Sequence, residues 1–510
     1  MRLLLPILCI LSLLACQNAI AKKQNLSVYA KVTGFRANHF VSPSGKDTNP
    51  GTVELPWATI NHAAETAIAG DTVMISGGRY LLSSQVRVHS SGRPNAWISF
   101  VGMPGEKVVL DAQDISSDPI IKGRLNEGAF QVQGVSYVRV ANLTIINSHD
   151  AGITVRDASD IEIINNTTKG TFSSGIAVWD TNHDDKGTER IRVVGNTISR
   201  ATTWDLAPPN ADRIGEPPHE ALSIGGAIDF EVAYNRVLDS DKEGITIKET
   251  SKHGKVHHNV VEGLARQGIY VGSYFGRLAD IEVFSNVIHN CHGAGFALSV
   301  EQGEPTEQVS FHNNLVFKND GSGVYFSRWG VENMRRDISI SHNIFYHNGF
   351  GTPEPGQAYP WWTGGVYLYS ANVEGITIKD NIFSENHGFQ IGYSQLFLKN
   401  NRSWQAAARA QRILINHNLF FTVEKVTFPI ESGGAPFDRL KIYGANGAHP
   451  VFGDPSFTDI ANGNFTLRAN SVARRVHILA GPIPSTRCLQ TWLARTSTRH
   501  IGAWAGTPAK

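Results

Sequence analysis

Short hydrophobic stretches alternate with polar bends along most of this chain, and the pattern repeats. One unit runs from YNRV at 234–237 to GITI at 244–247, and the next runs from HNVV at 258–261 to GIYV at 268–271. An Asn followed by β-branched residues, then a bend and a Gly-Ile-x-apolar stretch, indicates two short strands joined by a turn. Because the two copies lie about two dozen residues apart, the pattern predicts a solenoid built from stacked coils.

Asparagine marks one position of the repeat, and glycine marks the start of another strand. An inward-facing Asn in such a stack can bond to the coils above and below, which satisfies its buried amide. The predicted ladder comprises Asn142, Asn165, Asn196, Asn235, Asn259, Asn286, Asn314, Asn343, Asn381 and Asn418. The predicted core strands begin at Gly152, Gly175, Gly244, Gly268, Gly295, Gly323 and Gly365.

The segment at 40–80, beginning FVSPSGKDTNPG, resembles the N-terminal cap of secreted right-handed parallel β-helix proteins. Within it, apolar residues at helical spacing predict a short helix laid over the first coil, which would hide open strand edges. These residues are Ile60, Ala63, Ala64, Ala67 and Ile68. The segments GDPSF at 453–457 and NFTL at 464–467 are similar to the closing part of the same proteins. The resemblance implies an all-β chain with one right-handed parallel β-helix domain at 40–510 and an N-terminal capping helix.

Charge and composition narrow the choice of partner. The 510 residues carry 46 Lys and Arg against 45 Asp and Glu, a net charge of +1. That balance gives no electrostatic reason to expect nucleic-acid binding, so an acidic ligand would have to be held by local groups. A stacked solenoid of this length needs no second domain, and we expect a monomer.

The N-terminus indicates export. Arg2 precedes an apolar run that is too short to remain as a membrane span, so residues 1–21 are expected to be an export signal and 22–39 a tether. Leu13-Leu14-Ala15-Cys16 resembles a lipobox, which would attach lipid to Cys16, whereas cleavage after Ala21 would free the chain. The expected location is therefore the cell surface or outer membrane as a lipoprotein, or the periplasm or exterior as a secreted protein. Beyond this segment only Cys291 and Cys488 remain, and both are expected to be free thiols.

Equivalent positions of stacked strands form columns on the outside of the solenoid. The residue just beyond each Gly-apolar-x-apolar strand is predicted to give the column Arg156, Trp179, Ser223, Lys248 and Gly272, and the next column holds Asp157, Asp180 and Glu249. His219 and Glu220 stand at the head of the same stripe, and Glu243 and Arg266 precede the two following strands. Far more ionisable groups gather here than a structural turn requires.

The arrangement around Glu243, Lys248 and Arg266 resembles the chondroitinase-B and alginate-lyase family of β-helical polysaccharide lyases. That resemblance implies a uronate substrate, with Lys248 as the base and Arg266 assisting. The lone lysine is also similar to that of calcium-dependent pectate lyases, which implies a calcium site at Asp239, Asp241 and Glu243. Apart from calcium, no cofactor is expected.

The chemistry of β-elimination sets its own demands. The uronate carboxylate must be neutralised by a cation, and the base needs a pKa near the working pH. A neighbouring Arg266 and partial burial are expected to lower the pKa of Lys248. The leaving oxygen needs a third group, for which Tyr270, Tyr274 and His219 are candidates.

Further residues are candidates for binding the polysaccharide. Exposed aromatic rings beside a groove suit the apolar faces of sugars, although a loop tryptophan can equally pack on its own stem. An insertion at 350–363 supplies such rings. The predicted substrate-binding residues are Arg156, Asp180, Trp179, Glu249, Tyr274, Trp361 and Trp362.

Three functions remain open, since the fold does not choose among them. The first is a lyase that cleaves a uronate-containing glycan. The second is a glycoside hydrolase using two facing carboxyl groups such as Asp180, Glu220 or Glu243. The third is a surface protein that binds glycan without cleaving it. A plainer interpretation of Lys248 and Glu249, a solvated face with ion pairs between coils, also stands.

Overall fold

The computed structural model describes residues 37–118, 122, 127–184, 186–209, 211, 216–328, 333–352, 363–422, 449–476 and 478. Several predictions lie outside these residues. They concern the export signal, Cys16, Cys488, Trp361 and Trp362. No helix in the described part of the chain is long and apolar enough to cross a membrane.

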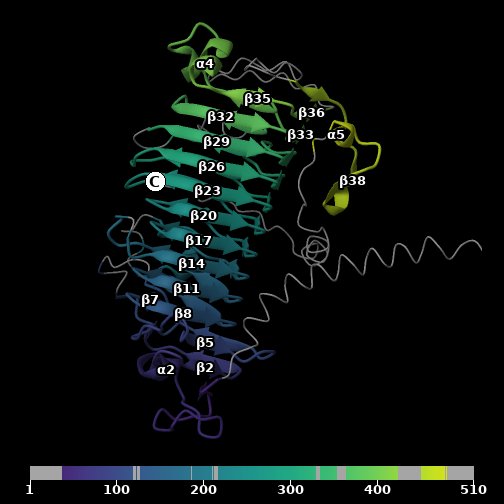
Figure 1. Ribbon diagram of the computed structural model, residues 1–510. Coiled ribbons are helices and arrows are strands. Elements are labelled where there is room, and N and C mark those ends of the chain that lie inside the picture. Colours follow the sequence, from purple (N-terminus) through teal and green to yellow (C-terminus); the bar gives the residue numbers. More distant parts are fainter. Residues whose placement is uncertain are drawn as a thin grey trace, which may run out of the picture.

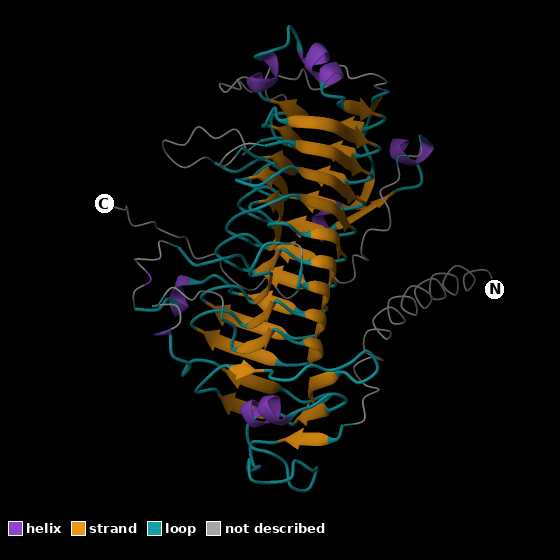
Figure 2. Ribbon diagram, turned by 60° about the vertical axis from the view of Figure 1, so that its left-hand side comes forward, coloured by secondary structure: helices purple, strands orange, loops and turns teal. Residues whose placement is uncertain are grey.

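The chain winds into a parallel β-helix, as predicted. Each regular coil contributes one strand to each of three long parallel sheets, so strands three apart in the chain are neighbours in space except at the ends of the solenoid, where β1 pairs with β2 and β36 with β37. Figure 1 shows these strands stacked from the purple end to the green end. Figure 2 shows the same column from another side, with the connecting loops projecting mainly to one side of it.

Sheet 1 has 13 strands in the order β1-β2-β5-β8-β11-β14-β17-β20-β23-β26-β29-β32-β35. Their bounds are His39–Val41, Thr72–Ile75, Ile98–Gly102, Ser136–Ala141, Ser159–Ile164, Glu189–Val194, Ile228–Ala233, Lys252–His257, Leu278–Phe284, Thr306–His312, Arg335–Ser341, Val373–Lys379 and Leu414–Asn416. Sheet 2 has 11 strands and runs from β4 through β7, β10, β13, β16, β19, β22, β25, β28 and β31 to β34. Their bounds are Val86–Arg87, Phe130–Gln133, Ile153–Arg156, Ile176–Trp179, Leu222–Gly225, Ile245–Lys248, Ile269–Ser273, Phe296–Val300, Val324–Phe326, Val366–Leu368 and Ile391–Tyr393.

Sheet 3 again has 13 strands, β3-β6-β9-β12-β15-β18-β21-β24-β27-β30-β33-β36-β37. Their bounds are Gly78–Leu81, Val108–Asp111, Thr144–Ser148, Thr167–Thr171, Thr197–Ser199, Arg236–Leu238, Val260–Glu262, Val287–His289, Leu315–Phe317, Ile344–Tyr346, Ile382–Ser384, Leu419–Phe421 and Val451–Phe452. In the part of the chain that the structure describes, the short helices are α2 (Ile60–Thr66), η1 (Trp204–Leu206), η4 (Gln395–Leu398), α4 (Trp404–Ala410), η5 (Ile460–Asn462) and α5 (Val472–Arg475).

The interior of the solenoid is one continuous apolar column. The alternate residues of each strand point inward; in β19 and β22 these are Ile245, Ile247, Ile269 and Val271, all fully buried. They belong to a hydrophobic cluster that extends from Val41 in the first coil to Phe420 near the last. Because the side chains alternate across each strand, the residues between them face outward and are available for function.

The asparagine ladder is present from Asn196 to Asn418, where each side-chain amide donates to the Oδ1 of the Asn in the next coil at 2.9–3.0 Å. One coil earlier, Asn166 donates to Asn196 Oδ1 in the same way, so the ladder begins at Asn166. The predicted rungs Asn142 and Asn165 are wrong, because both sit at positive φ in the turn one residue earlier. A second ladder, Asn319–Asn348–Asn386, was not predicted.

The predicted helix at the N-terminal end is α2, which is capped by Thr59 and buries Ile60, Ala63 and Ala64. It packs beside β4, the first strand of sheet 2, and Figure 1 shows it at the purple end of the solenoid. Ile68 does not belong to its buried face, since that side chain is 64 % exposed beyond the helix end.

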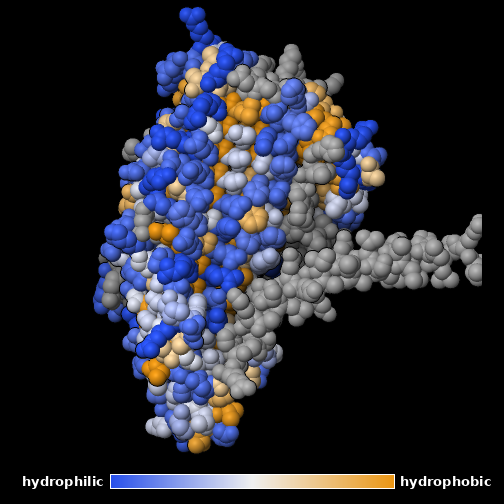
Figure 3. Space-filling view, in the orientation of Figure 1, coloured by the Kyte–Doolittle hydropathy of each residue, from blue (hydrophilic) through white to orange (hydrophobic). Residues whose placement is uncertain are grey.

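The C-terminal segment covers part of sheet 3. The antiparallel hairpin of β38 (Phe457–Asp459) and β39 (Asn464–Leu467) places Phe457 and Phe465 on the outward apolar side chains of that sheet. Sheet 1 has a different outer face. There Arg139, Glu162, Arg192 and Glu231 form a ladder of ion pairs, and Figure 3 shows a mainly hydrophilic surface over this sheet.

Candidate active site

A charged pocket of about 380 Å³ lies on the outer side of sheet 2. Its walls come from strands β19 and β22, from the bends before β16, β19 and β22, and from the residue that follows β25. The lining residues are Glu216, Glu220, Lys242, Glu243, Lys248, Arg266, Gln267, Tyr270 and Glu301. Five of these nine were predicted as catalytic residues. They were expected to gather because they occupy neighbouring coils.

The register of sheet 2 differs from the predicted columns in one coil. Gly225, not Ser223, pairs with Trp179 on one side and Lys248 on the other. The segment ALSIG at 221–225 lacks the Gly-Ile start of the neighbouring strands. The predicted column therefore took Ser223 from this segment, two residues before the residue that occupies the column, Gly225. Ser223 belongs instead to the outward column that continues through Thr246 and Tyr270.

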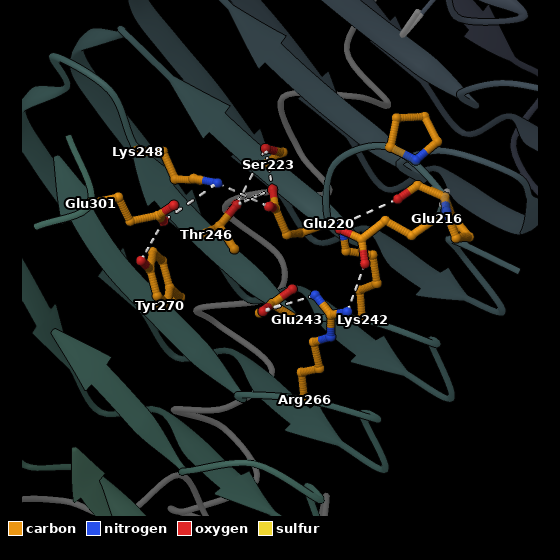
Figure 4. A network of polar contacts seen from close by, with 12 residues as sticks. Glu216, Glu220, Ser223, Lys242, Glu243, Thr246, Lys248, Arg266, Tyr270 and Glu301 are labelled. Carbon is orange, nitrogen blue, oxygen red and sulfur yellow. Dashed lines mark hydrogen bonds and ion pairs between the residues drawn. The ribbon is translucent and has the colours of Figure 1, made fainter. Parts of the chain in front are cut away.

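This register surrounds Glu220 with donors. Glu220 Oε1 lies 3.2 Å from Lys248 Nζ. Glu220 Oε2 accepts hydrogen bonds from the hydroxyls of Ser223 at 2.9 Å and Thr246 at 3.0 Å, as Figure 4 shows. Burial alone would raise the pKa of this carboxyl, but Lys248 and then Lys242 outweigh it and hold the pKa well below its ordinary value. Glu220 is therefore an ionised carboxylate.

Glu243 differs from Glu220 in the direction in which its pKa is shifted. It stands two residues before β19, as Glu220 stands two residues before β16, so the two occupy equivalent positions in adjacent coils. Neighbouring strands are about 4.8 Å apart. Glu243 Oε2 is buried without a hydrogen-bond partner, and Oε1 is 3.7 Å from Arg266. Burial and then the charge of Glu220 raise the pKa of Glu243, so this carboxyl holds its proton to higher pH.

The expected pairing of Lys248 with Arg266 is absent. Lys248 lies between carboxylates, at 3.2 Å from Glu220 and 3.9 Å from Glu301. Arg266 contacts Glu216 at 2.7 Å and Glu243 at 3.7 Å, and Figure 4 shows glutamates between the two cations. Although burial opposes it, Glu220 and Glu301 raise the pKa of Lys248. The prediction that Arg266 lowers this pKa is therefore wrong.

Tyr270 lines the pocket as predicted, but its hydrogen-bond partner, Glu301, was not predicted. Its hydroxyl donates to Glu301 Oε1 at 2.5 Å, and its ring lies 5.8 Å from Lys248 Nζ. Burial and then Glu301 raise the Tyr270 pKa well above its ordinary value, so the phenol keeps its proton. Glu301 directly follows β25, the strand next to β22. Its position after a core strand was the signal that could have identified it.

Several predicted residues lie beside the pocket rather than in its lining. The Trp179 ring contacts His219 at 5.0 Å between centroids, and burial lowers the pKa of His219 to about 4. Gly225 gives the Trp179 ring its room, because a Cβ there would lie 2.8 Å from Trp179 Cε3. Tyr274 accepts a hydrogen bond from Gln302 at 3.0 Å. Arg156 is at the end of β10, two coils before Gly225.

Asp180 and Glu249 continue the adjoining outward column, and both are deeply buried. Each has one carboxyl oxygen without a hydrogen-bond partner. Burial is the main cause of the raised pKa of Asp180, and it also raises the pKa of Glu249 to about 7.

The three predicted calcium ligands do not come together. In the described ranges, no group of three or more His, Cys, Asp or Glu side chains is placed to hold a metal. Asp241 is bonded to Thr203 and Trp204, Asp239 faces the next coil at Gly263, and Glu243 faces the pocket. The bend between β18 and β19 turns successive side chains to different sides. A calcium requirement stays a prediction, without this cluster to support it.

Comparisons with known proteins identify the family. A family described as a right handed beta helix region matches residues 128–306 and 302–403, and one described as Pel9A-like matches residues 39–204. The uncharacterized protein YwoF of Bacillus subtilis (strain 168) is 27 % identical over 472 residues, which cover 86 % of this chain and 92 % of that protein. Pectate lyase PEL9 of Emericella nidulans is 29 % identical over 143 residues, 27 % of this chain and 35 % of that enzyme.

Solved structures are similar to this chain at low identity. The crystal structure of pectate lyase Pel9A is 12 % identical, with a TM-score of 0.44 over 86 % of this chain and 91 % of that one. The complex of XylC with xylose is 12 % identical, with a TM-score of 0.47 over 82 % and 87 %.

Proposed function

Because the chain belongs to the right-handed β-helix family and carries a pocket with two differently charged carboxyl groups, we propose that it is a carbohydrate-active enzyme that hydrolyses a glycosidic bond. The observation that carries this proposal is the pair Glu220 and Glu243. Two chemically identical groups in adjacent coils have their pKa values pushed in opposite directions. That separation is how an active site assigns one carboxyl to the base and the other to the acid.

The proposed mechanism uses both groups on one sugar linkage. Glu243, whose side chain lines the pocket and is 14 % exposed, donates its proton to the leaving oxygen. Glu220 acts as the carboxylate, either by activating water or by attacking the sugar carbon. Lys248, Ser223 and Thr246 keep Glu220 ionised and hold it in one orientation. In this mechanism Lys248 is a positioning residue.

Similarity to a known enzyme supports carbohydrate as the substrate. The relative PEL9 is named a pectate lyase, and the Pel9A-like family match covers the first coils of this solenoid. The pocket itself is rich in paired polar groups, as expected of a site that binds hydroxylated ligands.

The pectate-lyase relative also favours a second candidate, β-elimination with Lys248 as the base. That reaction needs a neutral lysine. The carboxylates of Glu220 and Glu301 hold the proton on Lys248 and raise its pKa, so a substrate would first have to remove this stabilisation. Hydrolysis by the carboxyl pair needs no such rearrangement, and for that reason we prefer it to β-elimination as the proposed reaction.

One assay separates the two reactions. Purified protein is incubated with pectin, alginate and glycosaminoglycans while new reducing ends and the absorbance of an unsaturated uronate are followed in parallel. We expect reducing ends without that absorbance, and at least a hundredfold loss of turnover in Glu243→Gln and in Glu220→Gln. Glu282→Gln, in the outer face of sheet 1, is the matched control and should keep wild-type turnover.

The variant Lys248→Arg further distinguishes hydrolysis from β-elimination. Arginine keeps a positive charge beside Glu220, so hydrolysis should persist at a reduced rate. A guanidinium does not readily give up a proton, so β-elimination should stop. Formation of unsaturated products that Lys248→Arg abolishes would favour the lyase and contradict hydrolysis.

A further inference from the structure

The pocket contains a second cluster of charges beside the carboxyl pair, and it points to the class of glycan. We propose that Lys242 and Arg266 form a binding site for an anionic substituent of the sugar, and that the carboxylate of Glu216 occupies this site when no substrate is bound. The inference rests on the proposed function only in taking the pocket as the glycan site.

The contacts of Glu216 are those of a bound anion. Its Oε1 lies 3.2 Å from Lys242 Nζ, and its Oε2 lies 2.7 Å from an Arg266 guanidinium nitrogen. The two cations come from successive coils, in the bends before β19 and β22. One carboxylate oxygen therefore faces each cation, an arrangement that a sugar carboxylate or a sulfate ester can reproduce.

The two cations need an anion. Lys242 is nearly buried, with a side chain only 9 % exposed, and it also donates a hydrogen bond to the carbonyl oxygen of Pro217 at 3.1 Å. Glu243, the other carboxyl near Arg266, has a raised pKa and lies farther from that guanidinium, at 3.7 Å against 2.7 Å for Glu216. Burial alone would raise the pKa of Glu216, but Lys242 and then Arg266 lower it, so Glu216 supplies the missing charge at neutral pH.

Glu216 itself is easily displaced. Its side chain is 53 % exposed, whereas the side chain of Glu220, which carries the chemistry, is only 8 % exposed. Glu216 is the more exposed member of both ion pairs, so water can solvate its carboxylate when it leaves them. A ligand anion that takes over both contacts would release Glu216 into solvent at small cost. It would also lie next to the acid Glu243, because Arg266 contacts both glutamates.

Binding of a small anion tests the site without requiring cleavage. Wild-type protein and Glu216→Gln are titrated by calorimetry at neutral pH with galacturonate, its methyl ester and inorganic sulfate. We expect Glu216→Gln to bind galacturonate about tenfold tighter than the wild type, because the competing charge is gone. The neutral methyl ester should show no gain. A larger gain for sulfate than for galacturonate would identify a sulfate ester as the recognised group.

The controls separate a local site from a general charge effect. Adding Lys242→Gln or Arg266→Gln to Glu216→Gln should remove the gain. Glu189→Gln removes a partly exposed glutamate that is paired with Arg190 on sheet 1, and it should leave both binding and turnover unchanged. An equal gain in Glu189→Gln, no gain in Glu216→Gln, or weaker binding together with a lower Tm in Glu216→Gln would overturn the proposal.

The two proposals fail separately. If no glycan is cleaved but Glu216→Gln gains affinity for the anion, the anion site stands and hydrolysis is wrong. If cleavage depends on Glu243 while Glu216→Gln gains no affinity, hydrolysis stands and the anion site is wrong. With a cleavable anionic glycan, Glu216→Gln should lower KM, because the substrate no longer competes with the Glu216 carboxylate.

Discussion

Glu220 and Glu243 show how one residue type acquires two roles in a repeated structure. They occupy the same register position in adjacent coils, and the side chains that surround them differ. Lys248, Ser223 and Thr246 give Glu220 an ammonium group and two hydroxyl donors, whereas Glu243 Oε2 is left without a donor. The environment, not the residue type, determines which carboxyl keeps a proton.

This difference predicts the pH dependence of turnover. Glu220 must be ionised, and its lowered pKa keeps it so down to strongly acidic pH. Glu243 must be protonated, and its raised pKa moves the loss of activity above the ordinary range of a glutamate. We expect kcat to fall as pH rises through the Glu243 pKa. Glu243→Gln should be slower by about 10²–10⁴ and should lack this alkaline limb. An unchanged alkaline limb in the residual activity would contradict Glu243 as the acid.

Glu249 predicts a pH dependence of stability that is independent of function. Burial raises its pKa in the folded protein to about 7, whereas an unfolded glutamate titrates near 4.3. Its protonated form therefore stabilises the fold fully below the unfolded pKa, and this contribution is lost as pH rises through the folded pKa. Wild-type protein should lose about 1–3 kcal/mol of stability between these two pKa values relative to Glu249→Gln.

Denaturant unfolding at several pH values measures this difference. Glu189→Gln, with a partly exposed carboxyl on sheet 1, serves as the control and should parallel the wild type. Parallel curves for the wild type and Glu249→Gln would show that Glu249 has an ordinary pKa.

At the scale of the element, the asparagine ladder sets the register of the coils. Asn259 donates to Asn286 Oδ1 at 2.9 Å and to the carbonyl of Val232 at 2.9 Å, while its own Oδ1 accepts from Asn235. Replacing it by Leu leaves buried donors and acceptors unpaired in two neighbouring coils. Asn259→Leu should lower the free energy of unfolding by about 2–5 kcal/mol.

Asn142→Gly is the control for this prediction. Asn142 lies outside the ladder at a φ of 59°, a conformation that Gly adopts without strain. Thermal and denaturant unfolding should show a change within about 1 kcal/mol for this variant. Similar losses in both variants would contradict the special role of the ladder.

Much of the architecture could be predicted from the sequence, because each coil repeats the same signal. The errors arose where the signal was ambiguous. Asn165 and Asn166 are adjacent, and only the turn geometry shows which one points inward. Likewise the strand at 221–225 lacks the glycine that fixed the register of its neighbours.

The candidate site was predictable in location but not in its pairings. The unusual density of ionisable residues between 239 and 266 identified the right coils. The partners of Lys248 depend on which of several nearby carboxylates its long side chain reaches. One of them, Glu301, is more than fifty residues away in the chain. The spacing of residues along the sequence shows neither which carboxylates Lys248 reaches nor that Glu301 is one of them.

At the scale of the whole molecule, a stacked solenoid confines each coil's interactions to its neighbours. The pocket lies on sheet 2, and the C-terminal hairpin covers sheet 3, so stability at one place need not alter chemistry at the other. Phe465 joins the hairpin to the solenoid. It is 1 % exposed, and its ring centroid lies 5.0 Å from that of Phe317 and 5.3 Å from that of Tyr346.

Phe465→Ala should therefore release the hairpin and leave the pocket intact. The lost burial weakens the contact by about 3–5 kcal/mol, more than a short hairpin is expected to recover from its own strands. Hydrogen exchange should show faster exchange in β38, β39 and the covered strands β27 and β30, with protection of β16, β19 and β22 unchanged. Phe452→Ala removes an aromatic ring that is 44 % exposed and should change neither region. Faster exchange at β19 in Phe465→Ala, or a loss of turnover in that variant, would show that the coils are coupled over a longer range than nearest-neighbour stacking allows.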